Sequence, residues 1–556
     1  MFFLLVFQKK VVPLQRKALF SNHQYIITGY MCNSMKLPVG IQEFEKLRKE
    51  GYLYLDKTPL IWKMINEGCY YFLSRPRRFG KSLFMSTIQA FFEGKKQYFD
   101  GTVGQPLYIA SSENVNWNWE RYPIMHLDLN SQKYDTKEAV DDMLDEFLCK
   151  QESLYGKREY ERGFGLRFQG VIERAYKQTG KPVVILIDEY DKPMLQAIGN
   201  TELQDEYRST LKAFYGALKS KDGCIKFALL TGVTKFGKVS VFSDMNNLED
   251  ISMSPRFNNI CGITESELQS QLRPAVEELA EANNLSYDAC IDKLRLLYDG
   301  YHFLEDAEGM YNPFSVLNTL KNGKFGSYWF ETGTPTYLVT LLLSHNYSLE
   351  EMAHAEVEAD VLNSVDSEST NPIPVIYQSG YLTIKDYDKE FGLYRLGFPN
   401  KEVEDGFVKF LIPYYINNVK PSSAFDIRNY VQDIRQGNVD QFILRLRSLF
   451  ADTPYELIKD LENHYQNQVW LLHKLLGMYV NAEYHTSFGR IDMVLQTPKF
   501  CYVIEFKFDG SAQDAMNQIS SKDYILPFAL SDQQIIRIGM NISRETRNIE
   551  DCLVER

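Results

Sequence analysis

The segment 69–92 constrains the fold more than any other part of this chain, because it places a Gly-Lys-Ser sequence between a strand and a helix. Residues 69–73 form a short apolar run of strand character, and residues 83–92 follow a helical pattern. A strand, a loop that ends in Gly-Lys-Ser and a helix make up the setting of a phosphate-binding P-loop. The segment therefore predicts a nucleotide site in a domain of α/β type.

The expected nucleotide contacts follow from P-loop geometry. Backbone N–H groups and the N-terminus of the helix hold phosphates, the lysine reaches the β- and γ-phosphates, and the serine hydroxyl holds Mg²⁺. The residues expected to bind ATP and Mg²⁺ in this way are Arg77, Arg78, Phe79, Gly80, Lys81 and Ser82. The general pattern has a glycine at the position of Arg75, so this loop is a variant.

A second apolar run, residues 183–187, ends in Asp188 and Glu189 and is typical of a strand at the centre of a parallel sheet. We expect Asp188 to bind Mg²⁺ through water and Glu189 to orient the attacking water. Thr231, directly after the strand-like run 225–230, is expected to sense the γ-phosphate. An isolated Asp-Glu pair at a strand end is more often a helix N-cap, but its pairing with the upstream Gly-Lys-Ser favours a nucleotide site.

Near the other end, two β-rich runs, 489–494 and 501–507, are joined by a turn that contains proline. The first carries Asp492, and the second carries Glu505 and Lys507. Residues two apart in a strand share a face, so Glu505 and Lys507 point the same way. The oxygens of the two carboxylates suit a hard cation such as Mg²⁺, which polarises a phosphoryl oxygen and lowers the pKa of a bound water, and the ammonium completes the pocket. This set suits hydrolysis of a phosphodiester.

Helices on either side extend the pattern. Residues 471–477 form an apolar helical pattern closed by a glycine, and Glu462 upstream is placed to lend a third carboxylate. A turn at 509–511 leads to a helix that carries Gln518. Two alternatives remain open. Charged residues often mark the solvent face of an edge strand, and a fold of this type that has lost catalysis keeps nucleic-acid binding alone.

From about residue 455 to about residue 543, the chain resembles the PD-(D/E)XK nuclease superfamily, in the branch fused to an AAA-like ATPase. The resemblance implies a C-terminal, restriction-endonuclease-like α/β domain. It also implies that Asp492, Glu505 and Lys507 are catalytic and that Glu462 and Gln518 are accessory. The metal ligands of this domain would then be Glu462, Asp492 and Glu505.

Several separate motifs resemble the AAA-ATPase-like family, and they occur at residues 37–42, 54–58, 75–82, 187–191, 246–250, 298–301 and 311–315. Arg-Pro-Arg-Arg-Phe-Gly-Lys-Ser is that family's own P-loop, which accounts for Arg75. The resemblance implies an N-terminal parallel-sheet domain with ATP and Mg²⁺ as cofactors. A homo-oligomer formed through this AAA-like domain is also consistent with it.

The patterns divide the 556 residues into five regions. Residues 1–34 are an extension of doubtful role, with a membrane-surface anchor as the disfavoured alternative. The other regions are an AAA-like ATPase domain at 35–250, a helical lid or adaptor at 251–335, a mixed spacer at 336–454 and the nuclease-like domain at 455–556. A dense aromatic loop at 328–335 is expected to form an inter-domain contact.

Composition indicates the compartment and the partners. No apolar run is long enough to span a bilayer, and the 8 cysteines show no Cys-x-x-Cys spacing, so we expect a cytoplasmic protein without membrane contact. The net charge of −12 predicts modest intrinsic affinity for nucleic acid, because that affinity comes largely from Lys and Arg on phosphates. The expected partner is nonetheless nucleic acid, with DNA favoured over RNA.

Together these features predict an ATP-binding protein, an ATPase, coupled to a Mg²⁺-dependent nuclease. The alternative is a nucleotide-dependent interaction protein whose C-terminal domain binds nucleic acid or protein without cutting.

Overall fold

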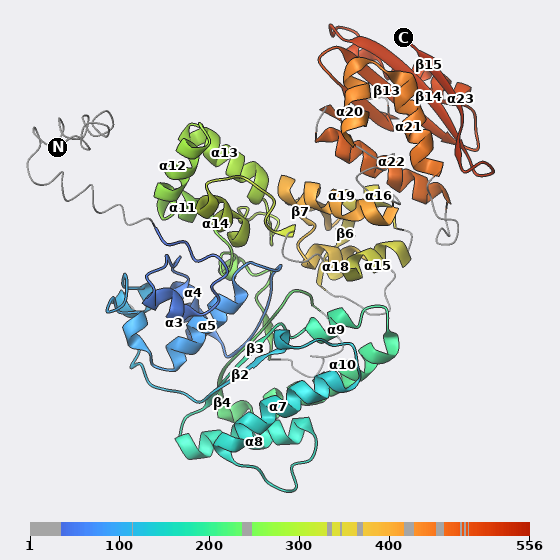
Figure 1. Ribbon diagram of the computed structural model, residues 1–556. Coiled ribbons are helices and arrows are strands. Elements are labelled where there is room, and N and C mark those ends of the chain that lie inside the picture. Colours follow the sequence, from blue (N-terminus) through green and yellow to red (C-terminus); the bar gives the residue numbers. More distant parts are fainter. Residues whose placement is uncertain are drawn as a thin grey trace, which may run out of the picture.

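The computed structural model describes residues 35–113, 115–235, 247–330, 336–344, 347–363, 371–415, 427–451, 461–478, 481–482, 485–486 and 489–556. The expected extension 1–34, part of the motif at 246–250 and part of the aromatic loop lie outside the described residues. Figure 1 shows an N-terminal α/β part, a middle part and a C-terminal part that follow one another in sequence order.

The N-terminal part is built on a parallel sheet of five strands in the order β2-β3-β4-β1-β5. The strands are β1 (Tyr70–Ser74), β2 (Ile124–Asp128), β3 (Val183–Asp188), β4 (Ile225–Gly232) and β5 (Glu249–Asp250). Every residue of β1 and β3 is buried, as expected for strands covered on both faces. The carboxyl ends of β1, β3 and β4 therefore meet at one edge of the sheet.

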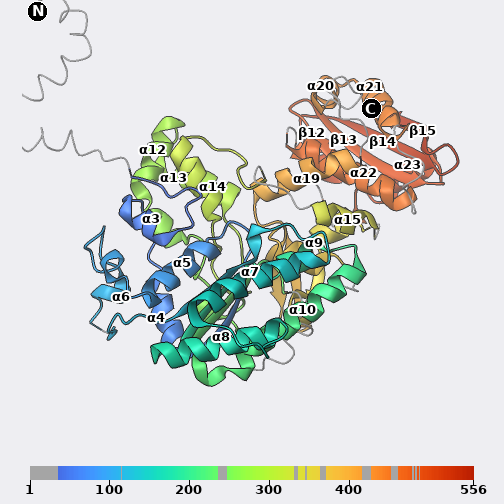
Figure 2. The same cartoon turned by 60° about the horizontal axis from the view of Figure 1, so that its bottom comes forward.

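Helices surround this sheet, and α7, α8 and α10 lie side by side (Figure 2). The helices of this part are α3 (Phe44–Lys49), α4 (Thr58–Glu67), α5 (Lys81–Phe92), α6 (Tyr108–Ser111), α7 (Glu138–Tyr155), α8 (Phe164–Thr179), α9 (Lys192–Gln196) and α10 (Thr201–Ser220). The rings of Phe168 and Phe214 stack 4.4 Å apart between α8 and α10. The expected parallel α/β domain is confirmed.

The first section of the middle part is a group of four helices with its own small core. These helices are α11 (Glu265–Ser270), α12 (Arg273–Ala282), α13 (Tyr287–Tyr298) and α14 (Pro313–Asn322). Thr264 and Glu267 form a capping box at the start of α11, which satisfies two backbone N–H groups there. The expected helical region after the first domain is therefore present.

The second section of the middle part is mixed, with an antiparallel sheet in the order β6-β8-β7. Its elements are α15 (Thr336–Ser344), α16 (Leu349–Ala353), β6 (Glu356–Glu358), α17 (Ala359–Asn363), α18 (Ile373–Gln378), β7 (Thr383–Asp388), β8 (Leu393–Gly397) and α19 (Lys401–Tyr415). The short β-like piece expected at 380–384 begins only at Thr383, because Gly380 has a φ of +88° and belongs to the turn after α18.

The C-terminal part contains a mixed sheet in the order β15-β14-β13-β12-β9. Its elements are α20 (Ile427–Gln436), α21 (Val439–Ala451), α22 (Leu461–Gly477), β9 (Asn481–Ala482), β10 (His485–Thr486), β11 (Gly489–Arg490), β12 (Met493–Gln496), β13 (Phe500–Phe508), α23 (Ala512–Ser521), β14 (Gln534–Ser543) and β15 (Asn548–Glu555). β13 and β14 run parallel, so the chain needs a crossover between them, and α23 supplies it. The expected α/β class of this domain is confirmed.

Two helices that the expected boundary at 455 assigns to the spacer pack on this sheet. The Tyr502 hydroxyl in β13 donates to the carbonyl oxygen of Ile434 in α20 at 2.7 Å. The Asn548 side chain at the start of β15 donates to the carbonyl oxygen of Arg447 in α21 at 3.0 Å. Helices α20 and α21 therefore pack on the C-terminal sheet, which the residues after them form.

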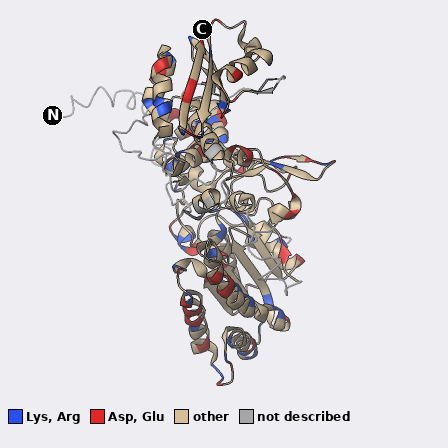
Figure 3. Cartoon of the chain, turned by 90° about the vertical axis from the view of Figure 1, so that its right-hand side faces the viewer, with Lys and Arg blue, Asp and Glu red and all other residues tan. Residues whose placement is uncertain are grey.

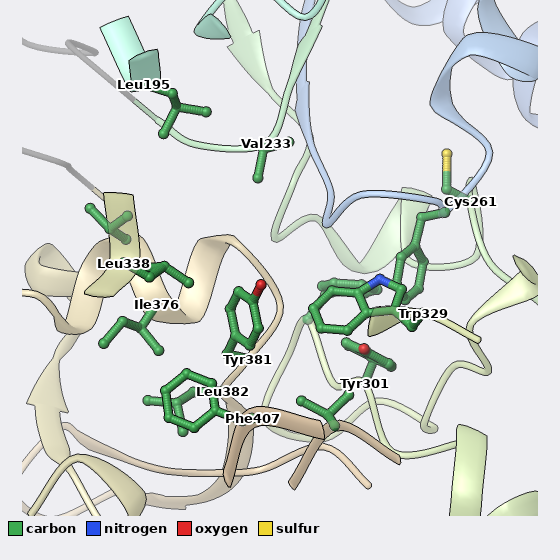
Figure 4. Close-up of a cluster of buried hydrophobic side chains, with 14 of the residues drawn as sticks. Leu195, Val233, Cys261, Tyr301, Trp329, Leu338, Ile376, Tyr381, Leu382 and Phe407 are labelled. Carbon is green, nitrogen blue, oxygen red and sulfur yellow. The ribbon is translucent and has the colours of Figure 1, made fainter. Parts of the chain in front are cut away.

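One hydrophobic core runs from the N-terminal part through the middle part into the C-terminal part, where it includes Tyr465, Met493 and Tyr502. Figure 4 shows Leu195 and Val233 near Ile376, Tyr381 and Trp329, which come from the middle part. Within the described part of the chain, no helix has both the length and the apolar character needed to cross a membrane.

Candidate nucleotide and metal sites

A cavity of about 550 Å³ opens beside the P-loop. The loop and the start of α5 contribute Arg77, Arg78, Gly80, Lys81 and Ser82 to its wall. Gly80 is the N-cap of α5 and has a φ of +96°, a conformation that a residue with a Cβ adopts only with strain. The sequence therefore needs glycine at this turn to lead β1 into α5 with backbone N–H groups facing the cavity.

The catalytic side chains expected around ATP lie together at this edge of the sheet. The Ser82 hydroxyl donates to one oxygen of Asp188 at 2.6 Å, and the Thr231 hydroxyl donates to the other. The Lys81 ammonium donates to the carbonyl oxygen of Arg75 at 3.1 Å and lies 3.5 Å from the Glu189 carboxylate. Lys81 is only 4% exposed, so these contacts satisfy a buried charge.

Three residues expected to bind ATP or Mg²⁺ are not part of the cavity wall, namely Phe79, Asp188 and Thr231. The Phe79 ring packs against Tyr301 and Phe303 with centroids 4.8 and 5.7 Å apart, which leaves only its backbone for the loop. Thr231 is fully buried behind Asp188 and does not line the cavity. The buried Arg75 donates to the carbonyl oxygens of Ser74 and Ser252, so its role here is structural.

Asp191 is a buried acid near the same edge that local sequence reasoning did not assign. Its carboxylate accepts hydrogen bonds from the backbone N–H of Val233 and from Thr234. Burial and the nearby Glu189 carboxylate raise the pKa of Asp191 to about 6. Asp191 therefore ties the turn after β3 to the turn after β4.

Other walls of the nucleotide cavity come from outside the P-loop itself, and some come from outside the P-loop domain. Segment 38–42 and the start of α14 line one side, and Trp329, Phe330 and Tyr381 line another. The Trp329 indole N–H donates to the carbonyl oxygen of Arg77 in the P-loop at 3.3 Å. The described part of the aromatic loop is thus an inter-domain contact, as expected, and it is also a wall of the cavity.

In the C-terminal part, Asp492 and Glu505 lie side by side. Asp492 directly precedes β12, and its carboxylate accepts the backbone N–H of Phe506 at 2.8 Å, between Glu505 and Lys507. Glu505 is 2% exposed, and burial together with the Asp492 carboxylate raises the pKa of Glu505 to about 7, against the opposing effect of Lys507.

Lys507 and Gln518 complete this group. The Lys507 ammonium lies 3.2 Å from one Glu505 oxygen, so the two side chains share a face as expected. It also donates to the Gln518 side-chain oxygen at 2.6 Å, and the Gln518 amide donates to Glu505. Glu462 lies in the first turn of α22, but its side chain is outside the described residues.

A cavity of about 360 Å³ opens on this group. Helix α22 lines this cavity with residues that the sequence analysis did not assign to a site, namely Gln466, Val469, Trp470, His473 and Lys474. Their spacing of three or four residues places them on one face of the helix, and that spacing can be seen in the sequence. Glu350 and His354 reach the same cavity from the region of α16 in the middle part. The wall of this site therefore includes residues from outside the nuclease-like domain.

The carboxylates of Asp492 and Glu505 suit a divalent cation, because one of their oxygens has no hydrogen-bond donor. The Glu505 Oε2 atom is buried and makes no hydrogen bond, a costly state for a carboxylate oxygen unless a cation or proton satisfies it. Among the described residues, no group of three or more His, Cys, Asp or Glu side chains is close enough to form a metal site. Among the described side chains, Asp492 and Glu505 are placed to hold a cation, with further ligands from water or from substrate oxygens.

Comparison with known proteins agrees with this division of the chain. Residues 38–242 match the family described as predicted AAA-ATPase, and residues 460–552 match the PD-(D/E)XK nuclease superfamily. A protein of Azotobacter chroococcum mcd 1, named "Uncharacterized protein in vnfD 5'region", is 32% identical over 532 residues, which cover 94% of this chain and 99% of that protein. Both resemblances seen in the sequence are confirmed, in the expected order. The chain therefore belongs to the predicted AAA-ATPase family and carries a PD-(D/E)XK nuclease superfamily domain near its C-terminal end.

Proposed function

We propose that this protein is a metal-dependent nuclease whose activity is governed by an ATP-binding domain. One observation carries the proposal: Glu505, whose Oε2 atom is buried and makes no hydrogen bond, lines a cavity together with Asp492 and Lys507. Lys507 and Gln518 both contact the other oxygen of this carboxylate, Oε1, so Oε2 remains available to a cation. A divalent cation bound there would polarise a phosphoryl oxygen and lower the pKa of a water molecule.

The surrounding side chains have distinct roles in this proposal. Asp492 and Glu505 hold the cation, and Lys507 stabilises the charge that develops on the phosphate in the transition state. Gln518 fixes Lys507 and Glu505 relative to each other through its two hydrogen bonds. Lys474 and Lys507 supply positive charge to the cavity, where a phosphodiester backbone would lie.

The P-loop cavity is proposed to bind ATP with Mg²⁺. Lys81 would exchange its contacts with Glu189 and the Arg75 carbonyl for the β- and γ-phosphates, and Ser82 and Asp188 would hold the metal. Glu189, once released from Lys81, is placed to orient the attacking water. The apolar side of the cavity, which includes Ile41 and Phe314, suits the base of the nucleotide.

The test is cutting of plasmid and single-stranded DNA, and of a matched RNA, with and without Mg²⁺ and ATP. We expect Mg²⁺-dependent cutting that is lost in Asp492→Asn and kept in the matched control Asp532→Asn, an exposed acid in the loop before β14. Retention of cutting in Asp492→Asn would refute the site. Binding of nucleic acid without cutting by the parent protein would favour a nucleotide-dependent binding protein instead.

A further inference from the structure

Helix α19 lies between the nucleotide cavity and the nuclease-like cavity and contacts the walls of both. Its N-terminal turn and its middle touch the aromatic loop that lines the nucleotide cavity. Its opposite side touches α22, which lines the nuclease-like cavity. Neither family resemblance assigns any role to this helix.

The side of α19 that faces the nucleotide cavity is held by the buried carboxylate of Glu402 in its first turn. One of its oxygens accepts the Ser315 hydroxyl at 2.7 Å, and the other accepts the backbone N–H groups of Tyr328 at 2.6 Å and Trp329 at 2.9 Å. Ser315 belongs to α14, and its neighbour Phe314 lines the nucleotide cavity. Glu402 therefore joins α19 to two of the walls that an ATP molecule would touch.

Close packing strengthens this junction. A Cβ atom on Gly406 would lie 2.1 Å from the ring of Phe330, so the ring rests directly on the backbone of α19. The ring of Phe407 lies 5.3 Å from that of Tyr381, and both appear among the labelled side chains of Figure 4. Closely packed interiors have little free space, so a displacement of one side chain moves its neighbours. A displacement of Trp329 or Phe330 therefore moves α19, or α19 prevents it.

The side of α19 that faces α22 is held by Glu404, in the same first turn. Two residues along an α-helix turn about 200° around its axis, so Glu404 and Glu402 face opposite sides of α19. The Lys474 ammonium in α22 donates to Glu404 at 3.0 Å. Burial alone would raise the pKa of Glu404, but Lys474 and Lys401 outweigh that effect and hold the pKa below its ordinary value.

Lys474 is itself part of the nuclease-like cavity, one residue after His473. A second bond fixes the same two helices farther along, where the Gln468 side chain donates to the carbonyl oxygen of Tyr415 at 2.7 Å. A movement of α19 therefore changes the position of the α22 side chains that face Asp492 and Glu505.

We propose that α19 couples the two cavities. Glu402 transmits a displacement of the nucleotide-cavity wall to α19, and Glu404 sets the position of Lys474 in the nuclease-like cavity. This inference rests on the proposed function and names the element that regulates it. ATP in the cavity shifts the Trp329 loop, α19 follows through Glu402 and Gly406, and Lys474 moves with Glu404. Linkage requires the effect to be reciprocal, so nucleic acid bound at Lys474 must change the affinity for ATP by the same factor.

The experiment compares parent, Glu404→Gln and Asp405→Asn in the full chain. Asp405 is the matched control, because it is a neighbouring acid of α19 whose described ion pair is with Lys401 in the same helix. Two quantities are measured: the cutting rate without nucleotide, with ADP and with ATP, and the ATP affinity with and without a labelled DNA oligonucleotide. The affinity is measured in the background of Asp492→Asn, so it does not depend on cutting.

We expect ATP to change the parent's cutting rate or DNA affinity by about 5- to 150-fold, the usual span of such coupling. In Glu404→Gln, most of this response to ATP should be lost, although the variant still binds ATP and still cuts without nucleotide. Asp405→Asn should keep the response of the parent. If ATP changes the cutting rate or DNA affinity of Glu404→Gln and Asp405→Asn by the same factor, the proposed role of α19 is wrong.

The outcomes separate this inference from the proposed function. If the parent cuts but neither rate nor affinity responds to nucleotide, coupling through α19 is excluded and the nuclease stands. If the parent does not cut, the nuclease proposal fails, and the reciprocal change of ATP and DNA affinity still decides the coupling. Ser315→Ala removes one hydrogen bond to Glu402 and gives an independent check on the side of α19 that faces the nucleotide cavity. It is expected to reduce the response to ATP in part.

Discussion

At the scale of single residues, Glu505 is the side chain whose chemistry depends most on its surroundings. It is buried in the sheet, its pKa lies at about 7 instead of 4.5, and one of its oxygens has no hydrogen bond. In the absence of a cation, the folded protein therefore favours the protonated form below about pH 7. Metal binding must remove that proton, so metal affinity falls as the pH drops below this value.

The same shift predicts how stability depends on pH. Because the folded pKa is raised, the stabilising effect of the proton is fully present below about pH 4.5 and is lost as the pH rises through about 7. In metal-free buffer, Glu505→Gln should be more stable than the parent by about 1–3 kcal/mol at about pH 8, and equal to it near pH 4.5.

Added Mg²⁺ provides the control for this prediction. It should raise the thermal midpoint of the parent and leave that of Glu505→Gln unchanged, because only the parent presents both carboxylates. Thermal unfolding of the two proteins at both pH values, with chelator and with Mg²⁺, measures all of these differences. A parent that is more stable than the variant at high pH without metal would contradict the assignment of Glu505.

A second residue-scale prediction concerns the ion pair of Lys81 and Glu189. Lys81→Ala should weaken ATP binding by roughly 10-fold or more, because a buried charge-assisted contact to phosphate is worth about 1.5–3 kcal/mol. Glu189→Gln should keep or improve ATP affinity, since it removes the partner that holds Lys81 in the ligand-free state, and it should slow hydrolysis. Equilibrium nucleotide titration and phosphate release test the two variants, and normal affinity in Lys81→Ala would count against the P-loop assignment.

At the scale of elements, the nuclease-like site depends on how closely α23 lies against the sheet. A Cβ atom on Gly539 of β14 would lie 2.5 Å from the carbonyl oxygen of Ala512 and 2.8 Å from Met516, both in α23. Gly539→Ala should therefore push α23 away, cost about 1–3 kcal/mol of stability and reduce cutting, because Gln518 moves from Glu505 and Lys507.

Gly216→Ala is the matched control for this substitution. Gly216 lies inside α10, and a Cβ atom there meets nothing within 4 Å. The change should stabilise the protein by about 0.5–1 kcal/mol and leave cutting unaltered. Denaturation midpoints and cutting rates of the two alanine variants give the comparison, and equal effects of both would refute the close packing of α23.

Sequence reasoning succeeded where the information is local. The Gly-Lys-Ser loop, the acidic end of β3 and the alternation of Glu505 with Lys507 each follow from residues a few positions apart, and the strands and helices around them have the expected type. It placed Trp329 in an inter-domain loop but did not find its partner Arg77, and it did not find Glu402, because these contacts join residues about 70 or 250 positions apart. Nor did it show that Phe79 turns inward, since a loop motif does not tell which side chains face the core.

At the scale of the whole molecule, the charge distribution agrees with modest affinity for nucleic acid. Figure 3, which colours the cartoon by residue type, shows acidic and basic positions spread over the helices and strands of both halves of the chain. The net charge is −12, so salt-sensitive attraction over long distances is weak. Affinity must then come from the few basic side chains of the nuclease-like cavity, where Lys474 depends on α19 for its position.

The packing of α20 and α21 predicts the limits of a C-terminal fragment. A fragment of residues 427–556 keeps these helices over Phe500 and Tyr502, whereas one of residues 455–556 exposes that apolar face of the sheet. The longer fragment should be more soluble and melt at a higher temperature, and it should cut without any response to ATP because it lacks α19 and the nucleotide cavity. Size-exclusion chromatography, melting curves and cutting with and without ATP check this, with the full chain as reference. A longer fragment that still responds to ATP would show that the nucleotide acts on the C-terminal part itself rather than through α19.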